Sequence, residues 1–460
     1  MGLGRAGSKR AIALAVLVAA CGFPLPAPAQ PAGDATADAA QNRVWCENRQ
    51  RTFAPDQRIK GCTALIDSND LTRHDLAISH NNRGAAYQEK RDVERAIADY
   101  DEAIKLNPTY APAYNNRGNA HQLKSDFDAA IADYTNAIRF DFNFVQAFNN
   151  RGKAYQLKGD LDHAIADFDE ALRLNPSFGM AFLNRGDASL AKGDIDRALA
   201  YYNEGIRLEP SSATGLNNRG TAYGRKGDLD RALADYDASI RLDPTYAGAF
   251  RNRGLTYQRR DELDRALVDY DEAVRLDPKD PQNFSSRGIA RQVKQDLAGA
   301  LLDFNEAIRL DPKDIDGYRA RGFANFYAAH YAAAIPDLAR ALAEKPSDAY
   351  PALWLYLARK RSGDESAAAE LAANARSLKA SDWPYAVVEL YLGQRSPEAT
   401  LAAPAKADER CEAQFYIGEW DLLRSDRTAA IEALTAAANT CPKDFVEFAD
   451  AKAELKRLAQ

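Results

Sequence analysis

The sequence predicts an all-α protein, a right-handed superhelical solenoid of antiparallel helix pairs with a helical cap at each end. A glycine recurs every 34 residues, an alanine follows each glycine by 12 residues, and a proline closes seven of the eight units. A fixed period of this length indicates stacked helical units rather than separate globular domains. The glycines are Gly84, Gly118, Gly152, Gly186, Gly220, Gly254, Gly288 and Gly322.

Each unit is predicted to contain two helices joined by a tight turn. The glycine and the alanine are small residues that let two antiparallel helices approach closely. Lys-Gly-Asp at 158–160, 192–194 and 226–228 places Gly after one helix and Asp at the N-cap of the next. The second helix ends at Leu-Asn-Pro or Leu-Asp-Pro in most units, because proline cannot continue a helix.

This spacing of glycine, alanine, aromatic residue and proline resembles the tetratricopeptide repeat. The aromatic residue stands four residues after the alanine in seven units, for example Tyr100, Tyr134 and Phe168. The resemblance covers residues 77–348 as eight units. It implies a stack with a concave groove along its first helices.

The two ends of the chain are predicted to cap this array. Residues 30–76 read as a linker followed by a helical cap, whose second helix contains Thr-Ala-Leu-Ile-Asp. Residues 349–460 read as a degenerate helical region. Its repeat phase breaks at Trp383-Pro384 and restarts over 411–444, and a last helix covers about 445–458.

Four cysteines lie well inside the mature chain, two near each end. An even number suits an oxidising compartment, and the local pairs Cys46–Cys62 and Cys411–Cys441 are favoured over pairs between the ends. No Cys-x-x-Cys motif occurs and no His lies beside the pairs, so a metal site is not predicted there.

Residues 1–29 read as an export signal. A basic segment precedes the apolar run Ala-Ile-Ala-Leu-Ala-Val-Leu-Val-Ala-Ala, and Ala27-Pro28-Ala29 offers a cleavage site. The alternative is a lipoprotein signal over 1–20, because Val-Ala-Ala-Cys ending at Cys21 resembles a lipobox. Both alternatives predict an exported repeat protein, in the periplasm or outside the cell. The lipoprotein alternative also predicts that a lipid on Cys21 anchors the protein to the outer membrane.

One asparagine row is the candidate ligand-binding feature. Asparagine stands two residues before the glycine in six consecutive units and then lapses to Ser286 and Ala320. A similar row in tetratricopeptide proteins of the glycosyltransferase-associated type holds the backbone of an extended peptide, and an amide has the donors and acceptors for this. The alternative is that the amides bridge neighbouring helices. The residues are Asn82, Asn116, Asn150, Asn184, Asn218 and Asn252.

An arginine directly before each glycine is predicted to pair with an aspartate of the second helix, within a unit or between units. Internal carboxylates argue against a basic stripe for an anionic ligand. The predicted structural partners include Arg83, Arg117, Arg151 and Arg219 with Asp99, Asp133, Asp167 and Asp235.

Nothing in the sequence predicts an enzyme, a metal or a cofactor. It lacks the catalytic and phosphate-binding motifs. A net charge of −6 without a long basic run argues against a nucleic-acid partner. The oligomeric state is left open.

Several C-terminal stretches resemble the periplasmic lipoprotein family called new lipoprotein I. They include Leu-Trp-Leu-Tyr-Leu-Ala-Arg-Lys at 353–360 and Trp-Pro-Tyr-Ala-Val-Val-Glu-Leu at 383–390. The resemblance implies an adaptor that brings peptidoglycan hydrolases and a protease together. The alternative is a structural or assembly factor of an envelope secretion or export complex. Both predict protein partners, bound as extended segments.

Overall fold

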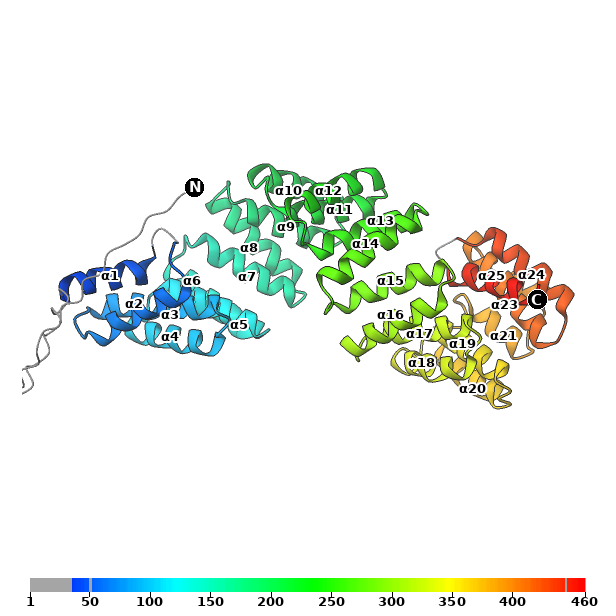
Figure 1. The fold of residues 1–460 in the computed structure, drawn as a ribbon. Coiled ribbons are helices and arrows are strands. Elements are labelled where there is room, and N and C mark those ends of the chain that lie inside the picture. Colours follow the sequence, from blue (N-terminus) through cyan, green and yellow to red (C-terminus); the bar gives the residue numbers. More distant parts are fainter. Residues whose placement is uncertain (1–34, 49–51, 443–444, 460) are drawn as a thin grey trace, which may run out of the picture. The chain divides into compact units, whose positions relative to one another are not determined.

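The computed structural model of the chain describes residues 35–48, 52–442 and 445–459 (Figure 1). The predicted signal segment 1–29, with Cys21, lies outside these residues. All regular secondary structure in the described ranges is helical, which confirms the predicted all-α fold. The helices fall into two compact units, Met1–Ala147 and Phe148–Gln460. None of the described helices is both long and apolar enough to cross a bilayer.

The first unit contains the predicted N-terminal cap and the first two repeats. Helices α1 and α2 of the cap are joined by the disulfide Cys46–Cys62, with an S–S distance of 2.09 Å. The helices α1 to α6 are Ala35–Glu47, Pro55–Asp67, Arg73–Glu89, Val93–Leu106, Ala111–Leu123 and Phe127–Phe140. Helix α7, Val145–Leu157, follows them.

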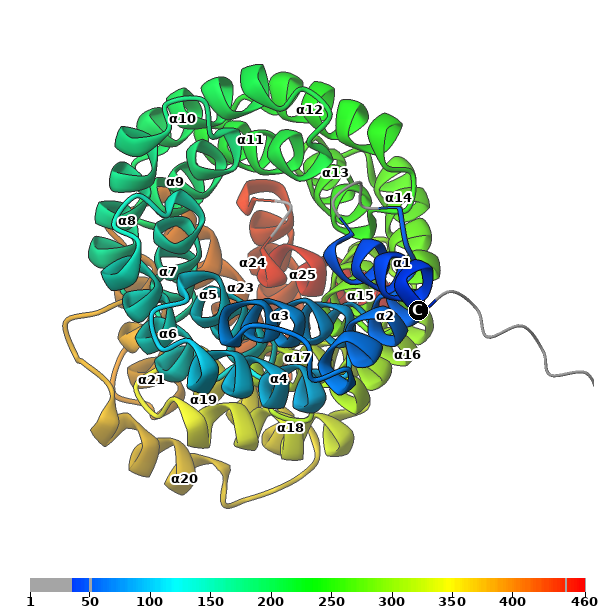
Figure 2. The ribbon, with the colours of Figure 1, turned by 90° about the vertical axis from the view of Figure 1, so that its left-hand side faces the viewer.

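The second unit continues the same alternation of first and second helices. Figure 2 shows α9, α11 and α13 in an inner row and α10, α12 and α14 in an outer row. The first helices therefore present one common face. Helices α8 to α18 are Leu161–Leu174, Gly179–Ala191, Ile195–Leu208, Ala213–Lys226, Leu229–Leu242, Ala247–Arg259, Leu263–Leu276, Pro281–Val293, Leu297–Leu310, Ile315–Tyr327 and Tyr331–Glu344.

The turn within a repeat follows from its local sequence. Gly227 has φ of +86°, a left-handed conformation that ends α11. Asp228 then accepts a hydrogen bond from the Arg231 backbone N–H and caps α12. Across the helix pair, a Cβ on Gly220 would lie 2.8 Å from the Tyr236 ring. Glycine is thus required there by the close approach of α11 and α12.

The C-terminal region of the second unit has one continuous apolar core in place of many small ones. Trp354 is fully buried at its centre, against Phe323, Phe326 and Phe415 at ring-centroid distances of 5.0 to 5.4 Å. The disulfide Cys411–Cys441 joins the ends of α23 and α24. Helices α19 to α25 are Ala349–Arg361, Ala367–Asn374, Tyr385–Tyr391, Pro397–Leu401, Ala407–Leu423, Arg427–Thr440 and Val446–Leu458, with a 3-10 turn at Ala375–Ser377 after α20.

Candidate peptide-binding site

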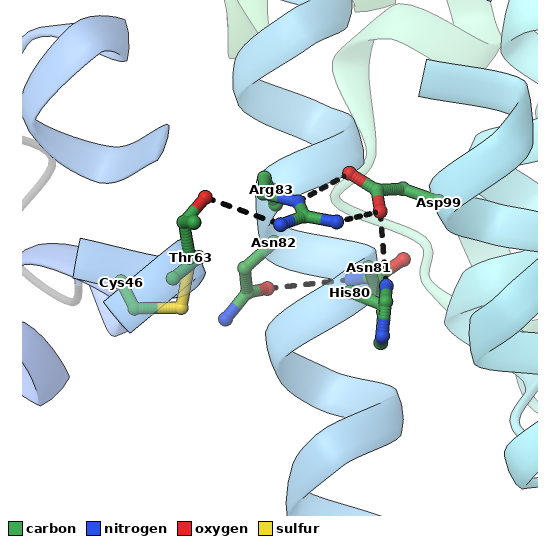
Figure 3. Close-up of a disulfide and its surroundings, with 8 residues drawn as sticks. Cys46, Thr63, His80, Asn81, Asn82, Arg83 and Asp99 are labelled. Atoms are coloured by element: carbon green, nitrogen blue, oxygen red, sulfur yellow. Dashed lines mark hydrogen bonds and ion pairs between the residues drawn. A yellow bond between two sulfur atoms is a disulfide. The ribbon is translucent and has the colours of Figure 1, made fainter. Parts of the chain in front are cut away.

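In seven of the eight repeats, the arginine before the glycine forms a two-pronged ion pair with the second helix of its own repeat. In the first repeat, Arg83 Nε donates to Asp99 Oδ2 at 2.8 Å and Nη2 donates to Oδ1 at 2.7 Å. The third nitrogen, Nη1, donates to Thr63 Oγ1 of α2 at 3.1 Å (Figure 3). Arg83 therefore ties its own helix pair to the preceding cap.

The other three predicted pairs have the same geometry, with N–O distances of 2.6 to 2.8 Å. They join Arg117 to Asp133, Arg151 to Asp167 and Arg219 to Asp235. The aspartates are nearly buried, so each bidentate pair replaces the water that its carboxylate loses.

Sequence reasoning missed a second acceptor for these arginines. It stands on the second helix of the preceding repeat, two residues after the paired aspartate of that repeat. Arg117 Nη1 donates to Asp101 at 2.6 Å, and Arg253 Nη1 donates to Asp237 at 2.6 Å. Arg185 uses Asp169 in this position because Tyr201 replaces its own aspartate. The recurring Asp-aromatic-Asp pattern of the second helices carried this signal.

The ion pairs fix the charge state of the buried carboxylate. Burial raises the pKa of Asp99, but hydrogen bonds from Arg83 and His80 outweigh it, and the net pKa is lowered. His80 Nδ1 lies 2.9 Å from Asp99 Oδ1 (Figure 3). The arginines are thus occupied within the stack and leave no basic stripe at these positions.

The predicted asparagine row is half-buried and takes part in an amide network between repeats. Asn116 Nδ2 donates to Asn81 Oδ1 at 2.9 Å. Asn184 donates to Asn149 at 2.8 Å, and Asn252 donates to Asn217 at 2.9 Å. These bonds join consecutive first helices, as the bridging alternative expects. Of the remaining row members, Asn82 accepts from Asn81 and Asn150 accepts from Asn149.

The first asparagine of the Asn-Asn pair, which sequence reasoning passed over, is the buried member of this network. Asn217 is 5% exposed, and its amide donates to Asn218 Oδ1 at 3.1 Å. Asn81, Asn115 and Asn149 occupy the same repeat position and are also buried. The doubling of asparagine in four repeats was the available signal.

A cavity of about 250 Å³ opens beside the asparagine row in the second unit. Asn217, Asn218 and Asn252 line it together with Asp187 and Arg225. Asn218 Nδ2 donates to Asp187 Oδ1 at 2.8 Å. Burial raises the pKa of Asp187, although hydrogen bonds from Tyr202 and Asn218 oppose the rise. The cavity lining therefore offers amide donors and acceptors beside the carboxyl group of Asp187 and the guanidinium of Arg225.

A larger cavity of about 660 Å³ shares Arg225 with the first. Its apolar lining comes from Leu229, Leu255, Leu263 and Val293. Leu255 is 49% exposed, on the first helix α13. Amide groups thus lie next to an apolar hollow, which is lined by Leu255 and Val293 of the first helices and by Leu229 and Leu263 at the start of the second helices.

Two family models match the chain, and both describe repeats. The model for the tetratricopeptide repeat matches residues 77–110, 111–144, 145–178 and 213–246. A second model, for the TPR repeat, matches residues 186–227. Neither describes an enzyme.

Similar solved structures include two that are described as TPR proteins. The APC/C hetero-tetramer Cut9-Hcn1 aligns with a TM-score of 0.51 at 14% identity, over 71% of this chain and 64% of that one. YrrB, described as a TPR protein with an unusual peptide-binding site, is 27% identical over 39% of this chain and 92% of its own, with a TM-score of 0.32. A TPR protein of Thermus thermophilus is 25% identical over 40% of this chain and 99% of its own, with a TM-score of 0.37.

The residues matched by the tetratricopeptide model coincide with predicted units, the second match lies within the predicted repeat region, and the helices follow the predicted pairs throughout that region. The resemblance of the C-terminal region to new lipoprotein I has no counterpart in these matches. The chain therefore contains tetratricopeptide repeats and has the all-α solenoid fold that such repeats build.

Proposed function

We propose that this protein is an exported scaffold that binds extended segments of partner proteins along its first helices. The cavity lined by Asn217, Asn218 and Asn252 is the observation that carries the proposal. An extended peptide exposes one N–H and one C=O per residue, and a row of amides can pair with both.

The adjoining apolar cavity supplies the second element of recognition. Leu255 and Val293 would contact an apolar side chain of the bound segment while the amides hold its backbone. Arg225 lies between the two cavities and donates to the Leu190 carbonyl at 3.3 Å, which holds its side chain across the inner row. We expect the partner motif to combine extended backbone with a large apolar residue.

The envelope role rests on the predicted signal, the cysteine pairs and the C-terminal resemblance. In the favoured version, the scaffold brings peptidoglycan hydrolases and a protease together. In the alternative version, it is an assembly factor of a secretion or export complex. Proximity labelling in the periplasm separates them, because the first predicts enrichment of hydrolases and the second predicts enrichment of the export machine.

Site-specific photo-crosslinking tests the binding face. A photoreactive residue replaces Leu255 on α13 or, as the matched control, Val268 on α14 of the same repeat. Both side chains are exposed, at 49% and 68%. We expect a discrete crosslinked partner from position 255 only. Equal crosslinking from both positions, or crosslinking from 268 alone, would overturn the proposed face.

Mass spectrometry of the N-terminus of the mature protein tests the predicted export signal. A soluble exported protein begins at Gln30, whereas a lipoprotein begins at an acylated Cys21. A chain that retains residues 1–20 in the cell contradicts both versions and removes the periplasmic partners from consideration.

A further inference from the structure

Three carboxylates that no repeat explains lie together in the C-terminal region. Glu419 stands on α23, and Asp450 and Glu454 stand one turn apart on α25. Their exposed fractions are 0%, 0% and 3%. A buried carboxylate requires a charge partner or hydrogen-bond donors, because it has lost its hydration.

Two arginines satisfy part of this requirement. Arg361 Nη2 donates to Glu419 Oε2 at 2.8 Å and lies 3.6 Å from Glu454 Oε1. Arg457 binds Glu454 through both Nε and Nη2. Arg457 Nη2 lies 3.8 Å from Asp450 Oδ1, which is an ion pair without a hydrogen bond.

Three buried oxygens accept no hydrogen bond from any described residue: Glu419 Oε1, Asp450 Oδ1 and Asp450 Oδ2. Such atoms are rare in folded proteins and call for a ligand or a proton. One ligand oxygen from each of Glu419, Asp450 and Glu454 lies within 4.8 Å of the other two. Two oxygens on one Ca²⁺ ion, at about 2.4 Å each, can be at most about 4.8 Å apart.

We propose that Glu419, Asp450 and Glu454 form a buried site for a hard, oxygen-preferring divalent cation of the Ca²⁺ type. Asp450 would bind through one or both of its oxygens, and Glu419 through Oε1. Glu454 would complete the set while it keeps its bonds to Arg457. The ion would join α25 to α23 at the end of the second unit.

The number of unpaired oxygens favours a cation over a shared proton. A proton on Asp450 could donate to Glu419 Oε1, and that bond would leave the other Asp450 oxygen unpaired. A cation can bind all three. The three acids and two guanidinium groups, all ionised, carry one net negative charge, so the local potential attracts a cation. Ca²⁺ accepts irregular carboxylate geometry, whereas Mg²⁺ requires near-octahedral geometry and retains water.

Calorimetric titration of the full chain tests the site. The protein is freed of metal with a chelator, transferred to chelator-free buffer near neutral pH and titrated with CaCl₂. We expect saturable binding of one ion per chain and a higher Tm with CaCl₂ than with NaCl of equal ionic strength. Asp450→Asn should abolish both effects, and Asp408→Asn, an exposed acid on the same α23, should preserve them.

Each other outcome overturns the proposal. Absence of saturable binding in the unaltered chain, with a Tm that Asp450→Asn raises regardless of calcium, identifies a buried proton instead. Binding that persists in Asp450→Asn places the ion elsewhere. Glu419→Gln provides the same test if Asp450→Asn fails to fold, which far-UV circular dichroism reveals.

Discussion

Within residues 77–348, nearly every repeat sets a buried aspartate of its second helix against an arginine of its first, whereas the described residues of 349–459 bury six acids, and two arginines pair with only three of these. In the repeats, Asp99, Asp133 and Asp235 are each paired at 2.6 to 2.8 Å. In the C-terminal region, the buried acids are Glu412, Glu419, Asp421, Glu447, Asp450 and Glu454. Arg361 and Arg457 lie against three of them.

The difference follows from periodicity. A repeat is copied along the chain, so an unpaired buried charge would recur in every copy and its cost would add up. A terminal region is present once and can keep an excess of carboxylate. The C-terminal acids therefore mark a place where stability falls as these carboxylates ionise, whereas the paired aspartates of the repeats stabilise the fold in their ionised form.

The largest effect is expected from the C-terminal core. Trp354→Ala removes a fully buried side chain that contacts Phe323, Phe326 and Phe415, and should lower the free energy of unfolding of this region by about 4 kcal/mol. Urea unfolding followed by the fluorescence of Trp383 and Trp420, in a background in which Trp45 of the N-terminal cap is replaced by phenylalanine, measures it. Far-UV circular dichroism should retain most of the repeat signal, and simultaneous loss of both signals would show that the regions unfold as one.

Within the repeats, the ion pair should matter most. Arg219→Ala leaves buried Asp235 without its partner and should cost about 2 to 3 kcal/mol, below the full cost of a buried pair because Arg219 keeps some exposure. Arg231→Ala is the control, since the Arg231 side chain is exposed, and the loss of its pair with Asp228 should change stability much less.

A double variant sharpens this prediction. Arg219→Ala with Asp235→Ala removes both charges and should recover part of the loss, because no buried carboxylate is left unpaired. Urea unfolding by circular dichroism reports it. An arginine variant as stable as the unaltered protein would remove the structural role assigned to these residues.

Sequence periodicity predicted the helix pairs and which residues meet across them. The 34-residue spacing placed Arg219 and Asp235 in facing helices, and the structure brings them together. Periodicity could not show which residue of each Asn-Asn pair is buried. The side chains of two adjacent helical residues point only about 100° apart, so either could face the neighbouring helix. The sequence did not predict the cluster of Glu419, Asp450 and Glu454, because the cluster depends on how α23 and α25 pack, and the 34-residue spacing does not determine that packing.

The two regions should respond to pH with opposite sign. Burial raises the pKa of Glu447 to about 7, and its partner Tyr416 lowers it only in part. The folded form thus binds the proton more tightly than the unfolded form, and the free energy of unfolding falls as pH rises from about 4.5 to about 7. Asp99 has a lowered pKa, so its contribution is present above the unfolded value and is lost only in acid.

Urea unfolding near pH 5 and pH 8 in the presence of chelator measures this difference. We expect the tryptophan signal of the C-terminal region to lose on the order of 2 kcal/mol at the higher pH. Glu447→Gln should reduce that loss, because the amide cannot ionise. An unchanged pH dependence in Glu447→Gln would assign the effect to other acids of the region.

The smallest expected change in stability is that of the asparagine row, and it distinguishes a structural role of the amides from a ligand-binding role. Asn252 Nδ2 donates to Asn217 Oδ1 at 2.9 Å, and Asn217 is buried. Asn252→Ala removes this donor from a buried acceptor and should cost about 1 kcal/mol. Leu255→Glu, one helical turn away at an exposed position, should change stability by less than about 0.5 kcal/mol. Urea unfolding of Asn252→Ala, Asn217→Ala and the double variant gives the coupling between the amides.

Binding of a partner identified by crosslinking then separates the two roles. If Leu255→Glu weakens binding and Asn252→Ala lowers stability alone, the amides join repeats and the apolar hollow selects the partner. If Asn252→Ala weakens binding and leaves stability unchanged, the amides serve the ligand and the bonds between repeats contribute little. Loss of both would show that one amide row does both tasks, since an amide has two N–H groups and can direct one to the neighbouring repeat and one to a bound peptide.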